Sequence, residues 1–257
     1  MPIVRVVTPT DPQTDTIKAF QAELVAKVAG SIDYRVYSAA DDNDNLDDVV
    51  KYAVSDSPAA ILACGSMAAK KLQDQTTSIP IVQVGGLRPA NAQSNLTGFT
   101  INTIGGKVVS QHHLDKLANA RKKITVLYDD SNEPSHAIFT NLQDPQKKVS
   151  PLNIGDPADF ATYTVATDGF MLIPNAMYFK HRKHIVAMLD NDNVKAVYFP
   201  EREYKMESSA ATQGKARIHG HDLPATFRAA ADIVAAILSH PNKSLPSLKE
   251  GIKDTDD

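Results

Sequence analysis

Hydroxyl and amide side chains recur where the sequence predicts the end of a strand and the start of a helix. These residues are Thr8, Thr10, Ser66, Ser131, Asn132 and Ser135. The first turn of a helix presents free backbone N–H groups and a partial positive charge, so a polar side chain beside it can help to hold a carboxylate or a similar anion. The same residue types cap helices in proteins of every function, which is the alternative interpretation of each one taken singly. Their recurrence at predicted strand ends favours a ligand-binding edge.

Cys64 is the only cysteine of the chain and ends an apolar run, directly before Gly65. At a helix N-terminus its thiol could act as a nucleophile, because the partial charge there lowers the pKa of a thiol. A free cysteine is more often a small buried apolar residue, and this is the interpretation that we favour. A single cysteine also excludes an internal disulfide.

Two pairs of histidines raise the question of a metal site. His181 and His184 are three positions apart on a predicted helix, and His219 and His221 flank a glycine. Zinc needs several donors that converge on one point. Residues 180–184 are also typical of a solvated basic helix face, and no glutamate stands at a metal-binding spacing. The sequence therefore predicts no metal site.

The motifs that bind common cofactors are missing. No Gly-x-Gly-x-x-Gly follows a predicted strand, and no Gly-x-x-x-x-Gly-Lys-Ser/Thr occurs. These glycine patterns form the phosphate cradles of dinucleotide and nucleoside triphosphate sites. The Gly-x-Ser-x-Gly turn that presents a hydrolase serine is missing too. We therefore expect no cofactor and no catalytic residue.

Composition and charge exclude two further classes of function. The chain has 257 residues, 42% of them apolar, and a formal net charge of −3. It has no broad cationic surface for a phosphate backbone, so we expect no nucleic-acid partner. No run approaches the roughly 18 apolar residues of a membrane span, so we expect a protein that is not membrane-embedded.

The first seven residues read directly as a strand and not as a signal peptide. The chain as given would therefore stay in the cytoplasm. Removal of a leader upstream of Met1 would instead place the protein in the periplasm or outside the cell, and both locations stay open.

Short apolar runs alternate with amphipathic stretches along the whole chain. The runs predict strands at residues 3–7, 33–38, 59–64, 79–84, 124–128, 148–153, 170–173 and 196–199. The stretches predict helices at residues 14–29, 45–55, 66–74, 104–117, 133–142, 157–166, 178–190 and 224–238. This alternation is typical of parallel sheets with helices on both faces, so we expect an α/β protein of two Rossmann-like lobes. In such sheets ligands bind beyond the carboxyl ends of the strands.

Short strings at collinear positions resemble those of one protein family. They are SIPIV at 78–82 with NLTGF at 95–99, FMLIPN at 170–175 with FKHR at 179–182, AVY at 196–198 with REY at 202–204, and HGHDL at 219–223 with FRAA at 227–230. Their order and spacing resemble those of the substrate-binding proteins of ABC transporters, a family that includes tryptophan- and tyrosine-binding members. The resemblance spans about residues 1–246.

The resemblance implies a type I periplasmic-binding-protein fold, in which two lobes joined by hinge crossovers close on a small ligand. It places the first lobe at residues 1–102, completed by about 214–246, and the second lobe at 103–213. Residues 247–257 would be a polar tail that frays. The ligand-holding loops of the family map onto Ser66, Gly85, Gly86, the segment from Ser131 to Ser135, and Asn175.

The chain departs from the family pattern in two of these loops. Gly85-Gly86-Leu87 stands where the family has Gly-Asp-Pro, and Pro174-Asn175 stands where it has Pro-Asp. The loss of two acidic groups that could hold an ammonium ion weighs against an amino-acid ligand.

Two tyrosines near these loops, Tyr178 and Tyr204, could offer aromatic surface to a ligand. Packing at the edge of a lobe is the alternative interpretation of both side chains.

Together these observations predict a non-catalytic solute-binding protein of an ABC-type uptake system, with the ligand held in the cleft between the lobes. The ligand is expected to be small, organic and polar, either amino-acid-like or a carboxylate, and an ABC permease is the implied partner. Two alternatives stay open: a cytosolic ligand-sensing regulatory module on the same fold, and an α/β enzyme that uses Cys64.

Overall fold

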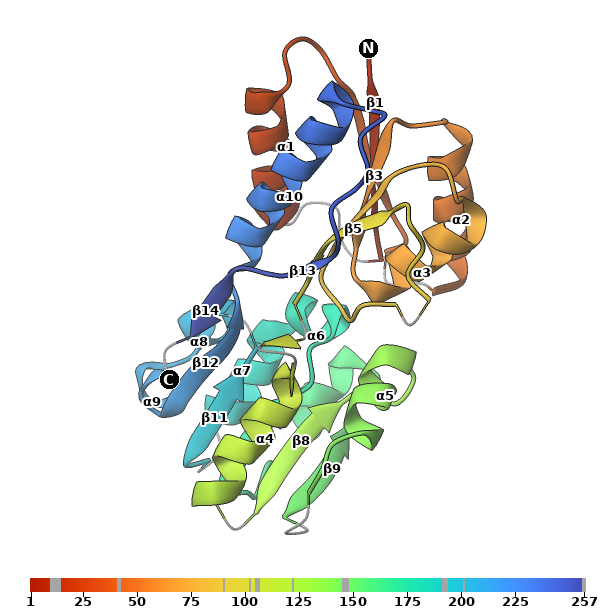
Figure 1. The fold of residues 1–257 in the computed structure, drawn as a ribbon. Coiled ribbons are helices and arrows are strands. Elements are labelled where there is room, and N and C mark those ends of the chain that lie inside the picture. The colour runs from red at the N-terminus through yellow and green to blue at the C-terminus, as the bar shows by residue number, and fades with distance from the viewer. Residues whose placement is uncertain are drawn as a thin grey trace. The chain divides into compact units, whose positions relative to one another are not determined.

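The computed structural model describes residues 1–9, 15–40, 43–89, 91–101, 103–104, 107–121, 123–144, 148–190, 194–200 and 202–255. The chain divides into two compact units (Figure 1). Unit 1 consists of Met1–Ile101 and Leu223–Ile252, and unit 2 consists of Asn102–Asp222 and Lys253–Asp257. The chain therefore passes between the units after Ile101, after Asp222 and after Ile252.

Unit 1 is built on a six-stranded sheet in the order β13-β5-β4-β3-β1-β2, and every pair in it is parallel. Its strands are β1 (Ile3–Thr8), β2 (Asp33–Ser38), β3 (Ala60–Cys64), β4 (Ile81–Val84), β5 (Leu96–Thr100) and β13 (Lys249–Glu250). Its helices are α1 (Asp15–Lys27), α2 (Asn43–Ser55), α3 (Ser66–Gln75) and α10 (Leu223–Ser239).

Alternate side chains of β1 point to opposite faces of this sheet. Val6 packs in a cluster with Phe20 of α1 and Val234 of α10, whereas Val7 packs in a cluster with Leu72 of α3. Helices α1 and α10 accordingly lie side by side over one face, and α2 and α3 cover the other (Figure 1).

Unit 2 repeats this plan with the sheet order β14-β12-β11-β10-β8-β9. Its strands are β8 (Ile124–Tyr128), β9 (Val149–Asn153), β10 (Gly169–Leu172), β11 (Ala196–Phe199), β12 (Ala216–His221) and β14 (Lys253–Thr255). All neighbours are parallel except β14, which runs antiparallel to β12. A separate two-stranded sheet pairs β6 (Thr103–Ile104) with β7 (Lys107–Val108).

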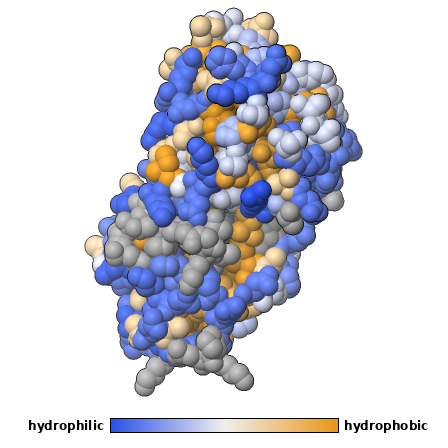
Figure 2. Space-filling model, in the orientation of Figure 1, coloured by the Kyte–Doolittle hydropathy of each residue, from blue (hydrophilic) through white to orange (hydrophobic). Residues whose placement is uncertain are grey.

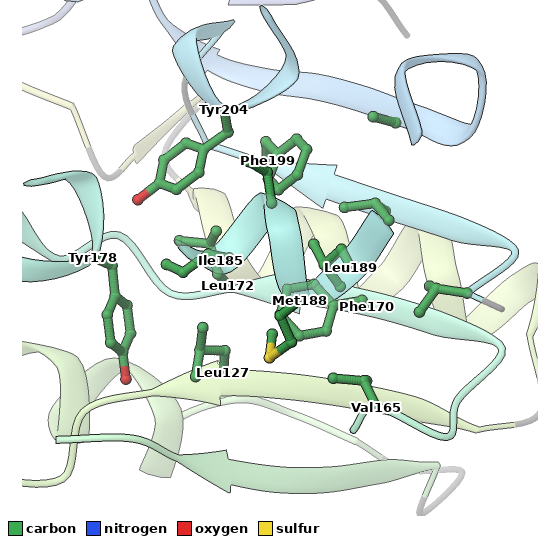
Figure 3. Close-up of a cluster of buried hydrophobic side chains, with 14 of the residues drawn as sticks. Leu127, Val165, Phe170, Leu172, Tyr178, Ile185, Met188, Leu189, Phe199 and Tyr204 are labelled. Atoms are coloured by element: carbon green, nitrogen blue, oxygen red, sulfur yellow. The ribbon is translucent and has the colours of Figure 1, made fainter. Parts of the chain in front are cut away.

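Unit 2 contains several short helices beside the 12-residue α4. Its helices are α4 (Val109–Ala120), α5 (Glu133–Thr140), the 3₁₀ helix η1 (Pro157–Thr162), α6 (Ala176–Lys180), α7 (Arg182–Asp190), α8 (Arg202–Glu207) and α9 (Ala210–Lys215). The main core lies under α6 and α7, where Leu127, Phe170, Ile185 and Phe199 are fully buried together (Figure 3).

These two sheets confirm the predicted fold class, and each of the eight predicted strands is present. Several strands have no counterpart in the prediction, and two of them are β5 and β12. Each contains a glycine, which weakens the strand signal. A Cβ added to Gly98 of β5 would lie 2.1 Å from the carbonyl oxygen of Gln83, and one added to Gly220 of β12 would lie 1.5 Å from that of Pro200. Close packing against a neighbouring backbone therefore requires glycine at both positions. The same glycines weaken the sequence pattern by which the two strands could have been predicted.

Several helices also differ from their predicted form. The helix expected at 178–190 is divided into α6 and α7 at His181, and the one expected at 157–166 is a 3₁₀ helix. The helices at 202–207 and 210–215 were not expected.

The lobe boundary and the tail differ from the prediction for one physical reason, which is strand pairing. The chain returns to unit 1 at Leu223 and not at about 214, because residues 216–221 form β12 beside β11. The tail expected to fray pairs with both sheets through β13 and β14. Between these strands, the N–H of Gly251 donates to the carbonyl of Thr100 at 2.9 Å and that of Ile252 donates to Oγ1 of Thr226 at 3.0 Å.

Within the described part of the chain, no helix combines the length and the apolarity that crossing a lipid bilayer would require. On the face drawn in Figure 2, hydrophilic residues cover most of the surface.

Candidate functional site

Asp129 directly follows β8 and organises the loop that leads to α5. Its side chain is 5% exposed. The carboxylate oxygen Oδ1 accepts hydrogen bonds from the backbone N–H of Ser131 at 3.0 Å and from the Ser131 hydroxyl at 2.6 Å. The backbone N–H of Asp129 donates to Oγ of the buried Ser135 at 3.0 Å. Hydrogen bonds within residues 129–135 thus hold this loop together around the carboxylate of Asp129.

Asn175 brings a second loop of unit 2 to the same carboxylate. It follows β10, which is the neighbour of β8 in the sheet. Its Nδ2 donates to Oδ2 of Asp129 at 3.0 Å, although 46 positions separate the two residues. Adjacent parallel strands end at the same edge of a sheet, so the polar groups after β8 and β10 meet there. We expected this edge to be short of acidic groups, and Asp129 supplies one beside Asn175.

Helix capping accounts for part of this arrangement. Asn132 is the N-cap of α5, and its side chain accepts from the N–H of Ser135 at 3.1 Å. Asn175 is the N-cap of α6, and its Oδ1 accepts from the N–H of Met177 at 2.8 Å. The capping interpretation is therefore correct for Asn132. Asn175 caps a helix in the same way, and both side chains still lie at one edge of the sheet.

The structure thus brings together four of the predicted site residues of unit 2, which are Ser131, Asn132, Ser135 and Asn175. Asp129 belongs to this group and is absent from the predicted set. Its signal in the sequence is an acidic residue placed directly after a buried strand.

In unit 1, the loops after β3 and β4 are bound to each other. Ser66 is the first residue of α3, and its hydroxyl accepts from the N–H of Leu87 at 2.8 Å. The alternative interpretation of Ser66 as the cap of α3 is wrong: the N-cap is Gly65, and it makes no side-chain capping bond. Gly85 and Gly86 have φ angles of 91° and 71°, in the left-handed region that favours glycine.

Gln83 is a buried support of this loop that the sequence analysis did not single out. It is fully buried on β4, and its Nε2 donates to the carbonyls of Gly85 at 2.7 Å and of Leu87 at 2.9 Å. A polar residue in an otherwise apolar strand, IVQV, is the signal that could have identified it.

The candidate residues on β1 and β3 do not form a nucleophilic site. Thr8 is 1% exposed at the end of β1, and Thr10 lies outside the described residues. Burial raises the pKa of the Cys64 thiol to about 12, and a hydrogen bond with Thr8 opposes the shift only in part. At neutral pH the thiol is therefore protonated, unlike an activated cysteine nucleophile.

Tyr178 and Tyr204 present no aromatic surface, which corrects the expectation that they do. Both side chains are 0% exposed in the core of unit 2 (Figure 3). The Tyr178 hydroxyl donates to the carbonyl of Ile154 at 3.0 Å, and the Tyr204 ring stacks on Phe199 with centroids 5.3 Å apart. The packing interpretation is therefore the correct one for both.

Among the described residues, no three or more histidine, cysteine, aspartate or glutamate side chains form a group that could hold a metal ion. The His181 and His184 rings stack with centroids 5.9 Å apart. The side chain of His219 lies outside the described part of the structure.

No protein-family model matches the chain, and no curated protein matches it either. Solved structures do match. A conserved domain protein from Vibrio cholerae has a TM-score of 0.78 at 19% identity, over 99% of this chain and 90% of that one. The ABC domain in complex with L-Trp from Streptococcus pneumoniae has a TM-score of 0.74 at 14% identity, over 97% and 90%. A leucine-binding protein from Thermotoga maritima has a TM-score of 0.67 at 12% identity, over 93% and 83%.

At these identities the likeness concerns the fold. The chain has the α/β fold of type I periplasmic binding proteins, with two units whose parallel sheets are flanked by helices.

Proposed function

We propose that this chain is a non-catalytic binding protein for a small polar organic solute and that it serves an ABC-type uptake system. The observation that carries the proposal is the group of Asp129, Ser131 and Asn175, which joins two loops at the carboxyl edge of the unit 2 sheet. Ligands of open α/β sheets bind just outside this edge. The fold neighbours support a binding role, since one holds L-Trp and another is named for leucine.

In this proposal both units contact the solute through the carboxyl edges of their sheets. Unit 1 contributes the helix start at Ser66 and the backbone of Gly85 and Gly86, and unit 2 contributes the group around Asp129. Hinge closure around a ligand is the mechanism by which periplasmic binding proteins respond to it. The chain passages after Ile101, Asp222 and Ile252 would carry the hinge.

A catalytic role has less support. The thiol of Cys64 is protonated at neutral pH because burial raises its pKa to about 12. A protonated thiol is a poor nucleophile.

A thermal-shift screen tests the binding role directly. It uses amino acids, amines, small carboxylates, purines and divalent metal salts, each at about 100 times a plausible dissociation constant. A bound ligand then adds about 2.7 kcal/mol of stability, which corresponds to roughly 5–10 °C for a chain of this size. A shift with one chemical class supports the proposal, and a flat response of the folded protein to all classes overturns it.

Uptake measurements separate transport from sensing. If the chain serves a transporter, deletion of its gene abolishes uptake of the ligand found in the screen. If it is a regulatory module on the same fold, the cells take up the ligand without it.

A further inference from the structure

Among the Asp, Glu, Lys and Arg side chains that the structure describes, two are buried: Arg5 in unit 1 and Asp129 in unit 2. Arg5 is 2% exposed and is paired twice, with Asp56 at 2.5 Å and Asp33 at 3.0 Å. Unit 1 therefore neutralises its own buried charge.

Asp129 has no such partner among the described residues. The hydrogen bonds of its carboxylate come from the backbone N–H and hydroxyl of Ser131 and from the amide of Asn175, and all three donors are neutral. Neutral donors replace hydration that the carboxylate loses on burial, but they leave its charge without a counter-charge. A cationic group would complete the site.

The carboxylate can also accept one more hydrogen bond. Two carboxylate oxygens offer about four acceptor positions. Three are occupied, two on Oδ1 and one on Oδ2. The open position lies on the oxygen that faces Asn175, at the edge of the sheet where ligands of this fold class bind.

We propose that Asp129 accepts a hydrogen bond from a cationic group of the solute, so that the ligand carries a protonated amine or a related organic cation. This inference rests on the proposed binding function and names the chemistry of its ligand. A hydrogen bond between an ammonium group and a carboxylate is about twice as strong as one between neutral groups. Ser131 and Asn175 hold the carboxylate from two loops before the ligand arrives, which lowers the entropy cost of binding.

A metal ion fits this site less well. Calcium and magnesium require six or more oxygen ligands, of which carboxylates are the main protein source. Within the part of the chain that the structure describes, no cluster of three metal-ligating side chains includes Asp129.

The test combines two variants with matched pairs of compounds. Asp129→Asn removes the charge at nearly constant shape. The double variant Asp129→Asn/Asn175→Asp exchanges the two side chains, so that one amide and one carboxylate still bond across the same gap and the net charge is unchanged. The probes are amines and amino acids, each compared with its counterpart that lacks the amino group, in thermal-shift measurements followed by calorimetric titration.

We expect the unaltered protein to bind only the amine-bearing member of a pair. We expect Asp129→Asn to weaken this binding at least about tenfold, a loss typical of a charged hydrogen bond. The double variant keeps a carboxylate at the site and recovers part of the affinity. If Asp129→Asn alone does not fold, the double variant decides, since binding of the amine by it supports the proposal and loss of selectivity for the amine contradicts it.

Three outcomes overturn the inference. Equal binding of the partner without an amine, with Asp129→Asn unimpaired, refutes it and leaves the binding function standing. A shift with a magnesium or calcium salt alone, abolished in Asp129→Asn, assigns the site to a metal. A flat response to every compound removes the binding function, and this inference with it.

Discussion

Gly86 lies so close to Ser66 that no side chain fits between them: a Cβ added to Gly86 would be 2.0 Å from Oγ of Ser66 and 2.5 Å from its backbone nitrogen. The loop after β4 therefore lies directly against the start of α3. The hydrogen bond from the N–H of Leu87 to Oγ of Ser66 holds it there at 2.8 Å.

Gly86→Ala should therefore destabilise the protein by about 1–3 kcal/mol, because it adds both a clash and a strained φ angle. Urea denaturation measures the change. Gly155→Ala is the matched control, since a Cβ at Gly155 meets nothing within 4 Å and its φ angle is not positive. Equal stability of the two variants would mean that the loop moves away from α3 without cost.

Ser131→Ala should weaken ligand binding about tenfold, because its hydroxyl and the carboxylate of Asp129 stand together at the proposed binding edge. Ser209→Ala is a close control. The Ser209 hydroxyl donates to Asp190 at 2.7 Å, against 2.6 Å from Ser131 to Asp129, but it precedes α9 and the amino end of β12. Calorimetric titration with the ligand from the screen should separate the two, and equal losses would point to a general effect on stability.

The pH dependence of stability should reveal the Arg5 network. Hydrogen bonds from Arg5 hold the pKa of Asp33 and of Asp56 below the usual range. A carboxyl group whose pKa is lower in the folded state stabilises the fold above its unfolded pKa of about 4, and this contribution is lost as the pH falls through the folded value. Stability should therefore decline below about pH 4, and Arg5→Met should flatten this decline while lowering the melting temperature at pH 7.

Arg35→Met is the control for the Arg5 variant. Arg35 also lies near Asp33, at 3.6 Å, but its side chain is 62% exposed. Exposed ion pairs contribute little, so this variant should keep the pH dependence of the unaltered protein. The same loss of pH dependence in both variants would contradict the assignment to Arg5.

Cys64 should react slowly with thiol reagents in the folded protein. Burial raises the pKa of its thiol to about 12, so almost no thiolate is present at pH 8. Labelling with an aromatic disulfide reagent at pH 8 should be slow in buffer and fast in concentrated urea. Rapid labelling of the folded protein, or loss of ligand binding in Cys64→Ser, would restore a functional role for this residue.

The strands that carry a continuous apolar run could be identified from the sequence, because a buried parallel strand needs such a run whatever surrounds it. The run at 59–64, for example, corresponds to β3. Strands β5 and β12, which have a glycine in their interior, could not be identified this way. Their glycines are required because the backbone of a neighbouring segment lies close to them. That contact produces no pattern in the local sequence.

For the candidate site, the sequence alone determined that polar residues follow β8 and β10 and that Asn132 can cap a helix. Only the tertiary structure decided that Asp129 and Asn175 meet, since strand order in the sheet places their two loops together across 46 positions. The tertiary structure also decided that Tyr178 and Tyr204 belong to the core. The sequence could not decide this, since a tyrosine that contacts a ligand and one that packs against a neighbouring helix have the same local sequence pattern. Hydrophobic periodicity and helix capping depend on residues a few positions apart, so they can be recognised in the sequence. Burial and the contact between distant loops depend on how the helices and strands pack, so only the tertiary structure determines them.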